Sequence, residues 1–164
     1  MITFKKASEK DIPLIRTLAE KSWNSSYREI LSTEQIEYML QNMYSIEEIS
    51  SHINNPDYQY FIIEESSIPA GFIGFEYHYE EKTTKLHRIY LLDDFKGKGL
   101  GKAALQFLKE KVCEVSDNRI ILNVNKNNTA QKMYETQGFT VYADGVFDIG
   151  NGYVMDDYLM EYHL

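Results

Sequence analysis

The segment Lys96–Lys102 contains three glycines and three lysines within seven residues, and a helical pattern follows it. Glycines at this density let the main chain approach a ligand closely. A helix that begins there turns unpaired N–H groups and the positive end of its dipole toward the same point. Phosphate groups bind in such surroundings. The segment therefore predicts a phosphate-binding loop.

Two familiar glycine-rich loops do not match this segment. A P-loop requires a glycine, four residues and then Gly-Lys-Ser/Thr, but here a lysine stands at the first position and Ala103 at the last. A dinucleotide fingerprint requires Gly-x-Gly-x-x-Gly, whereas these three glycines are spaced by two throughout, and the flanking strands favour antiparallel pairing. The loop must therefore belong to another class.

Lys96, Gly99 and Gly101 are spaced as Lys-x-x-Gly-x-Gly. With this spacing the loop resembles the acetyl-CoA loop of the GNAT superfamily of N-acetyltransferases, whose motif is Arg/Gln-x-x-Gly-x-Gly/Ala. Lysine departs from the family pattern at the first position, where the backbone N–H is the working group. A second family motif, Asn-x-x-Ala-x-x-x-Tyr followed by Gly-Phe, occurs in the correct order at Asn127, Ala130, Tyr134, Gly138 and Phe139. The resemblance covers roughly residues 70 to 140 and implies an acetyl-CoA-dependent N-acetyltransferase.

The resemblance also implies acetyl-CoA as the co-substrate, with no metal. The backbone amides of residues 97–102 would hold the pyrophosphate, the end of the preceding strand would pair with the pantetheine arm, and the lysines would add positive charge. An asparagine would bond the cofactor arm or order a water. The predicted cofactor-binding residues are Leu91, Leu92, Lys96, Gly97, Lys98, Gly99, Leu100, Gly101, Lys102 and Asn127. A longer acyl chain would use the same contacts, so the acetyl group follows from the resemblance alone.

Transfer of an acetyl group to an amine requires a proton for the leaving thiolate and a group that takes the proton of the ammonium. A tyrosine stays protonated at neutral pH, and Tyr134 is the predicted proton donor. His87 and Glu76 are the candidate bases, acting directly or through water. Cys113 is the only cysteine and has no histidine near it in sequence, so we expect it in the core rather than as a nucleophile.

Trp23, Tyr27 and the segment 32–43 lie where the family has its acceptor wall, and the sequence around them is similar to the PaiA-type polyamine acetyltransferase branch. A net charge of -8 favours a cationic acceptor. Five acids contribute to this near the C-terminus: Asp144, Asp148, Asp156, Asp157 and Glu161. The predicted substrate-binding residues are Trp23, Tyr27 and Asp156, with a polyamine-like acceptor. Acetylation of protein or peptide amino groups and a non-catalytic acyl-CoA-binding regulatory module stay open as alternatives.

Length and charge restrict the remaining choices. A chain of 164 residues fits one domain, residues 1–164, and the net negative charge works against a nucleic-acid partner. No apolar run is long enough to span a bilayer, the first residues have no apolar core of the kind a signal requires, and a lone cysteine suits a reducing compartment. We therefore expect a cytoplasmic protein with a small-molecule partner and no membrane partner, and a homodimer stays open.

The hydrophobic periodicity predicts an α/β (mixed α+β) order of elements. A strand over 2–7 precedes two helices between about 8 and 43 and a third that Asn55-Pro56 ends. Three runs rich in aromatic and β-branched residues, 58–65, 70–81 and 85–92, predict an antiparallel meander.

The remaining predicted elements are a helix over 101–115, a strand over 119–125, a helix over 129–137 and strands over 139–142 and 154–162, with turn signals at Asp144-Gly145 and Asn151-Gly152. With the family resemblance, this order implies a GNAT-like, mostly antiparallel sheet of about seven strands flanked by four to five helices.

Overall fold

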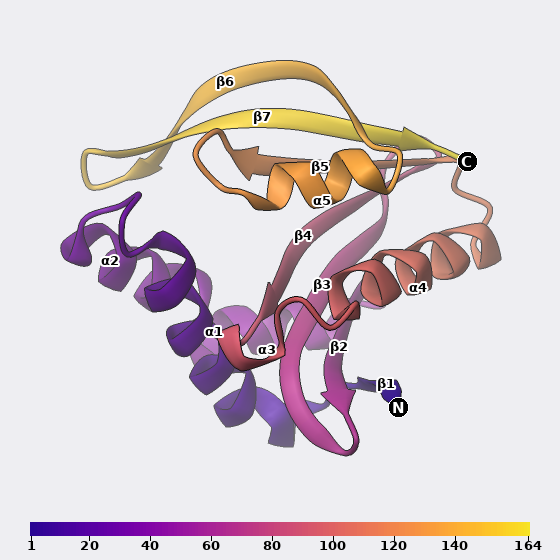
Figure 1. Cartoon of the computed structure of the whole chain (residues 1–164), viewed down its shortest axis with the longest axis horizontal. Helices are drawn as coiled ribbons and strands as arrows, with labels where there is room; N and C mark the ends of the chain where they lie inside the picture. Colours follow the sequence, from indigo (N-terminus) through magenta and orange to yellow (C-terminus); the bar gives the residue numbers. More distant parts are fainter.

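A computed structural model describes residues 1–164. One sheet of seven strands runs through the molecule in the order β1-β2-β3-β4-β5-β7-β6, with helices on both faces (Figure 1). This confirms the predicted mixed sheet. The strands are β1 Ile2–Lys6, β2 Tyr58–Glu65, β3 Ile68–Glu80, β4 Thr83–Leu91, β5 Arg119–Asn125, β6 Thr140–Gly150 and β7 Tyr153–His163. The helices are α1 Ile12–Tyr27, α2 Thr33–Met43, α3 Ile46–Asn54, α4 Leu100–Glu114 and α5 Ala130–Thr136, with short 3-10 helices at Glu9–Asp11 and Asp93–Phe95.

The first three helices begin at residues that suit helix starts. Pro13 stands in the first turn of α1, and the hydroxyls of Ser32 and Ser45 accept hydrogen bonds from main-chain amides that open α2 and α3. The apolar sides of α1 and α3 pack on β2, β3 and β4. None of the helices has the length and hydropathy needed to cross a membrane.

A second core lies on the opposite face of the sheet, under α4 and α5. Leu105 and Leu108 of α4 pack in one cluster with Leu86 of β4 and Leu122 of β5. The buried stripe of α4 continues to Val112. Cys113 lies on the exposed side of the helix, and our prediction of a core cysteine was wrong because the next residue of a helix is rotated by about 100°.

Strands β4 and β5 pair in parallel only along Thr83–Leu86 and Arg119–Leu122, although both continue beyond those residues. Figure 1 shows the two strands diverging after this short pairing. His87 is an extra residue in β4 at the point of divergence, because Phe75 and Gly74 of β3 pair with Leu86 and Arg88. Such a bulge bends a strand. The splay between β4 and β5 therefore begins at the bulge.

The hairpin of β6 and β7 is longer than predicted. The Asp144-Gly145 turn was wrong, because β6 continues through both residues and Gly145 pairs with Asp157 of β7. The chain reverses at the predicted Asn151-Gly152, where φ is 54° and 80°, the left-handed values that a tight hairpin turn requires. Helix α2 reaches the tip of this hairpin, where the Tyr38 hydroxyl donates to the Ile149 carbonyl at 3.2 Å.

Candidate active site

A cavity of about 450 Å³ lies where β4 and β5 separate. The unpaired part of β4, the segment before α4 and the first turn of α5 line it. Tyr27 closes the cavity at the end of α1, and Asn123 and Val124 contribute from β5. The cavity therefore joins the two motifs that the sequence singled out, which lie about thirty residues apart in the chain.

The glycine-rich loop presents main-chain donors at one end of this cavity. Gly97 and Gly99 have φ values of 78° and 81°, and Gly99 caps α4. No backbone amide from Gly97 to Lys102 donates to an acceptor within the chain. The loop also packs closely on α5, because a Cβ atom added at Gly101 would lie only 2.4 Å from the sulfur of Met133. Free amides at a helix N-terminus are suited to a phosphate group.

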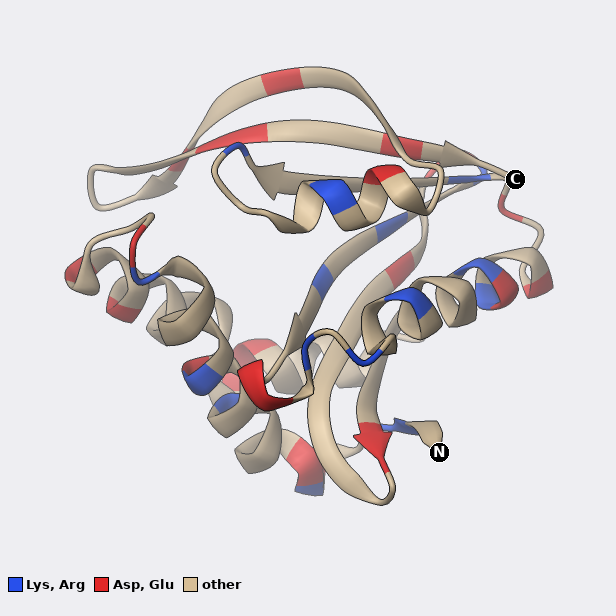
Figure 2. Cartoon of the chain, in the orientation of Figure 1, with Lys and Arg blue, Asp and Glu red and all other residues tan.

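The predicted loop residues do not all contribute side chains to the cavity. Lys96 and Lys102 line it, as do the three glycines and Leu100, whereas Lys98 does not. The Lys96 ammonium lies 3.0 Å from a carboxylate oxygen of Asp93. Leu91, the last residue of β4, lines the cavity, whereas the amide of the next residue, Leu92, donates to the Ala70 carbonyl at 2.8 Å. Figure 2 shows the lysines of this loop next to the start of α4.

His87 and Glu76, the two candidate bases, are in contact at the bulge of β4. The Nε2 atom of His87 lies 3.0 Å from Oε1 of Glu76, and His87 lines the cavity. Burial, together with the charges of Lys85 and Arg88, lowers the pKa of His87 to about 3. Burial raises the pKa of Glu76. At neutral pH the pair is a neutral imidazole, which donates Nε2–H, beside a carboxylate.

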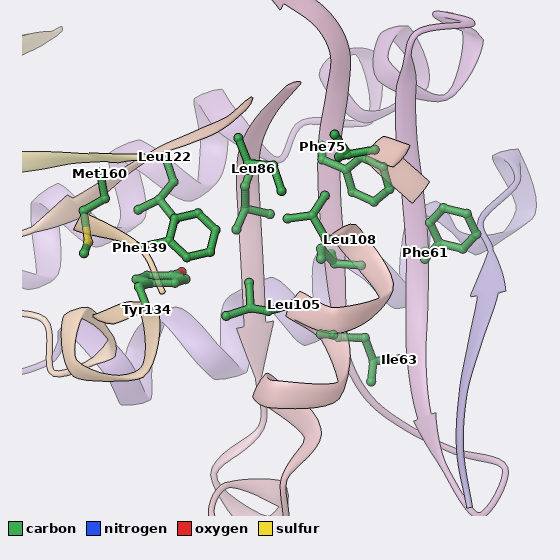
Figure 3. Close-up of a cluster of buried hydrophobic side chains, with 14 of the residues drawn as sticks. Phe61, Ile63, Phe75, Leu86, Leu105, Leu108, Leu122, Tyr134, Phe139 and Met160 are labelled. Atoms are coloured by element: carbon green, nitrogen blue, oxygen red, sulfur yellow. The ribbon is translucent and has the colours of Figure 1, made fainter. Parts of the chain in front are cut away.

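Tyr134 reaches the cavity from α5. Its ring packs against Phe139 at a centroid distance of 5.9 Å, next to Leu105 and Leu122 (Figure 3). Burial raises the pKa of Tyr134, and the neighbouring Tyr27 adds to the shift. The hydroxyl is therefore protonated at neutral pH and available as a donor.

Two adjacent asparagines precede α5, and they differ in position. Asn127 is exposed and lines a smaller cleft beside Asp93 and Lys96. Asn128 lines the main cavity, and its Nδ2 donates to the Tyr27 hydroxyl at 3.4 Å. Asn128 also accepts a hydrogen bond from the Ala130 amide at 2.9 Å, which starts α5. The asparagine side chain nearer to the cavity is thus the second of the two.

The two aromatic residues predicted for the acceptor wall are both buried in α1. Trp23 lies in the core, where its Nε1 donates to the Tyr44 hydroxyl at 3.1 Å, and it does not line the cavity. Tyr27 lines the cavity, with its hydroxyl 3.3 Å from that of Tyr90. The ring of Trp23 packs on Tyr27 at 4.5 Å. Trp23 therefore supports the wall that Tyr27 forms.

The C-terminal acids fall into two groups. Asp144 and the predicted substrate residue Asp156 are exposed and both contact the Lys126 ammonium, at 2.7 and 3.1 Å. Asp157, the next residue, is buried, and its Oδ1 has no hydrogen-bond partner. Burial raises the pKa of Asp157, and a contact with Asn123 partly offsets the shift.

Residues 27–154 match the family model of an acetyltransferase (GNAT) domain. The chain belongs to the GNAT acetyltransferase family. It is 24% identical over 151 residues to an uncharacterized N-acetyltransferase in the pepI 3′ region of Lactobacillus delbrueckii subsp. lactis, which covers 88% of this chain and 87% of that protein.

Solved structures show the same similarity. The PaiA N-acetyltransferase of Thermoplasma acidophilum, in complex with coenzyme A, is 25% identical to this GNAT acetyltransferase, with a TM-score of 0.85 and coverage of 100% of this chain and 99% of that one. A chimera of the Vibrio cholerae spermidine N-acetyltransferase SpeG and hSSAT shares the fold at 20% identity, with a TM-score of 0.74 and coverage of 99% and 95%.

The protein is thus an acetyl-CoA-dependent N-acetyltransferase. Its residues fit coenzyme A, because six free amides stand at the start of α4 for the diphosphate. The edge of β4 that faces β5 has no strand partner beyond Leu86, which suits the extended arm of the coenzyme.

Several residues of this GNAT site were not predicted from the sequence. Arg88, Asn123, Asn128 and Met133 all line the cavity, and Asp157 lies beside it. Asn123 and Asn125 alternate with apolar residues in β5, so period-two reading could have identified a polar face there. No comparable signal distinguishes Asp157 from Asp156.

Proposed function

We propose that the enzyme transfers the acetyl group of acetyl-CoA to a primary amine of a small, cationic, polyamine-like acceptor by direct attack. The observation that supports this most strongly is the cavity itself, which has free main-chain donors at one end and polar side chains, among them His87 and Asn123, along the sheet. The similarity to the spermidine N-acetyltransferase chimera is consistent with such an acceptor.

The chain's own groups supply binding and proton transfer. The amides of residues 97–102 bind the diphosphate, and the lysines around them add positive charge. The coenzyme, when bound, supplies the thioester carbonyl that the amine attacks. The Tyr134 hydroxyl holds its proton at neutral pH, and a leaving thiolate with a pKa of about 8.5 needs such a donor.

The proton of the attacking ammonium passes to the pair of His87 and Glu76, directly or through one water. Within this pair the Glu76 carboxylate, whose pKa burial raises, is the proton acceptor, and the neutral imidazole of His87 donates Nε2–H to it. A pKa of about 3 makes the imidazole itself a weak acceptor. Both residues lie at the bulge of β4, where the cavity begins. The amine is thereby neutral when it attacks.

Negative charge supports a cationic acceptor. The net charge of -8 draws cations toward the protein, and Figure 2 shows acids along both strands of the hairpin of β6 and β7. Neither the glycine-rich loop nor Tyr134 discriminates between acceptors, so the acceptor depends on the side chains of β5, β7, α1 and α2.

A panel assay tests the proposal. The purified protein is mixed with acetyl-CoA and with spermidine, other diamines, monoamines or short peptides, and the released thiol is measured. We expect turnover with the polyamines, and faster turnover of peptides would favour the alternative of protein acetylation. A protein that binds coenzyme A but turns over no acceptor contradicts the proposal and favours a binding module.

Tyr134→Phe tests the proton donor. We expect kcat to fall about 100-fold, because the hydroxyl contributes to transfer, while the Kd for coenzyme A measured by calorimetry stays within about twofold. Tyr142→Phe removes a hydroxyl from an exposed position on β6 and serves as the matched control. A Tyr134→Phe enzyme with unchanged kcat would exclude this role.

A further inference from the structure

Asp157 is a buried carboxylate whose Oδ1 has no hydrogen-bond partner, although the side chain of Asn123 bonds to the carboxylate group. Only 7% of the residue is exposed, and Oδ1 makes no hydrogen bond. A buried carboxylate normally has a cation or several hydrogen bonds, since removal from water is otherwise unfavourable. Its neighbour Asp156 already has the Lys126 ammonium at 3.1 Å. Asp157 is therefore a candidate for a carboxylate to which a bound ligand supplies the missing hydrogen-bond donor.

The register of the sheet places Asp157 beside the cavity. Asp157 pairs with Asn125 of β5, so both side chains lie on the same face as Asn123. Asn123 contacts Asp157 and lines the cavity. Burial raises the pKa of Tyr27, which lines the cavity at the end of α1, and the charge of Asp157 makes a smaller contribution in the same direction. Two of the residues around Asp157, Asn123 and Tyr27, thus line the cavity, whereas its register partner Asn125 does not.

Asp157 is too far from the bulge of β4 to act on the attacking amine. Leu86 of β4 pairs with Leu122 of β5, and Asp157 lies one strand beyond β5 and about three residues further along. In a regular sheet this separates the backbones of His87 and Asp157 by roughly 12 Å, and the splay adds to it. A cation at Asp157 is therefore a second charge on an acceptor whose first amine lies near His87.

We propose that Oδ1 of Asp157 binds the non-reacting ammonium of a linear diamine or polyamine acceptor. This deepens the proposed function and rests on it. An ammonium supplies the hydrogen-bond donor and the positive charge that the buried carboxylate lacks. Asp157 then sets the preference of the enzyme for acceptors with two amines over acceptors with one.

The test compares linear α,ω-diamines of increasing length, each with the n-alkylamine of the same length, in the wild type and in Asp157→Asn. For the preferred diamine we expect kcat/KM to fall roughly 30-fold or more, through a higher KM, while the matching monoamine changes little. An equal loss for both amines, or no loss, overturns the proposal. Asp148→Asn removes the same charge from an exposed site of the hairpin and controls for long-range attraction.

Two further measurements separate this inference from the proposed function. Diamines are titrated calorimetrically into the protein with coenzyme A, and binding that Asp157→Asn weakens supports the inference whether or not acetyl transfer occurs. A wild-type protein that binds no diamine overturns it. The thermal midpoint of Asp157→Asn should equal or exceed that of the wild type, because an uncompensated buried charge is removed. A lower midpoint would indicate a structural role instead.

Discussion

Asp117 and Asp157 are buried to nearly the same degree, with 5% and 7% exposed, but their surroundings are opposite. Asp117 accepts hydrogen bonds from the His78 amide and the Thr84 hydroxyl, at 3.0 and 2.7 Å, and contacts the His78 imidazole at 2.8 Å. Burial alone would raise the pKa of Asp117, and these contacts lower it below its ordinary value. In Asp157 burial prevails and the pKa is raised.

The positions of the two aspartates explain this contrast. Thr84, a partner of Asp117, lies where β4 and β5 pair, whereas Asp157 lies beside the splayed end of the same strands. At the closed end the chain satisfies the carboxylate of Asp117, and beside the splayed end it leaves Oδ1 of Asp157 without a hydrogen-bond partner. The free amides of residues 97–102 belong to the second class. Substitutions should therefore affect stability in the first class and ligand binding in the second.

The largest expected effect concerns the free amides. Gly99→Val places a branched side chain at a φ of 81°, so the loop must change its conformation. Loss of two hydrogen bonds to a charged diphosphate amounts to about 3 kcal/mol, or roughly a 100-fold higher Kd for coenzyme A. Isothermal titration calorimetry measures this directly.

Gly152→Val is the matched control, because Gly152 has a φ of 80° and no atom would lie near its Cβ either. It carries the same backbone strain in the turn between β6 and β7. Equal Kd values for coenzyme A in the wild type and both variants would show that the free amides of residues 97–102 do not bind the coenzyme. The distinction between the two classes of polar group would then be wrong for the loop.

The next effect concerns the satisfied class. Asp117→Asn removes the charge and one of two acceptor oxygens, and we expect the free energy of unfolding to fall by about 2–3 kcal/mol, with the Kd for coenzyme A unchanged. Urea denaturation measures the loss. Glu110→Gln, on the exposed side of α4, should change stability by less than about 0.5 kcal/mol. A higher Kd for coenzyme A without a loss of stability would place Asp117 among the groups that act in ligand binding.

The sequence predicted the elements whose signals are local. Periodicity indicated the order of helices and strands. Glycine spacing indicated the loop, because a left-handed φ and a close approach of the main chain to a ligand both favour glycine over other residues. The turn at Asp144-Gly145 failed because pairing with β7 overrode a local turn preference. Cys113 failed because one position decides which side of α4 a residue occupies.

Side chains that depend on partners distant in the chain were the hardest to predict. Asp156 and Asp157 are chemically identical neighbours, and only the pairing of β7 with β5 determines which of them is buried. The contact of His87 with Glu76 likewise depends on a bulge between β3 and β4. The sequence could nominate the two candidate bases without indicating that they touch.

The smallest expected effect concerns His87, whose neutral form the fold favours. The pKa is about 3 in the fold and about 6.5 in an unfolded chain, so between these values the unfolded state binds more protons. Stability therefore falls as the pH is lowered through this window, and His52, with a pKa of about 4, contributes in the same direction. In His87→Gln the slope of unfolding free energy between pH 5 and 6 should be shallower by about 1 kcal/mol per pH unit.

Urea denaturation across this range measures both slopes, and data between pH 8 and 9 provide an internal control, since both histidines are almost fully deprotonated there in either state. An unchanged slope in His87→Gln would mean that the Glu76 carboxylate keeps the pKa of His87 near its ordinary value. His87 would then belong with Asp117 among the groups that the chain satisfies, and the boundary between the two classes would lie beyond the bulge of β4, further along the splay.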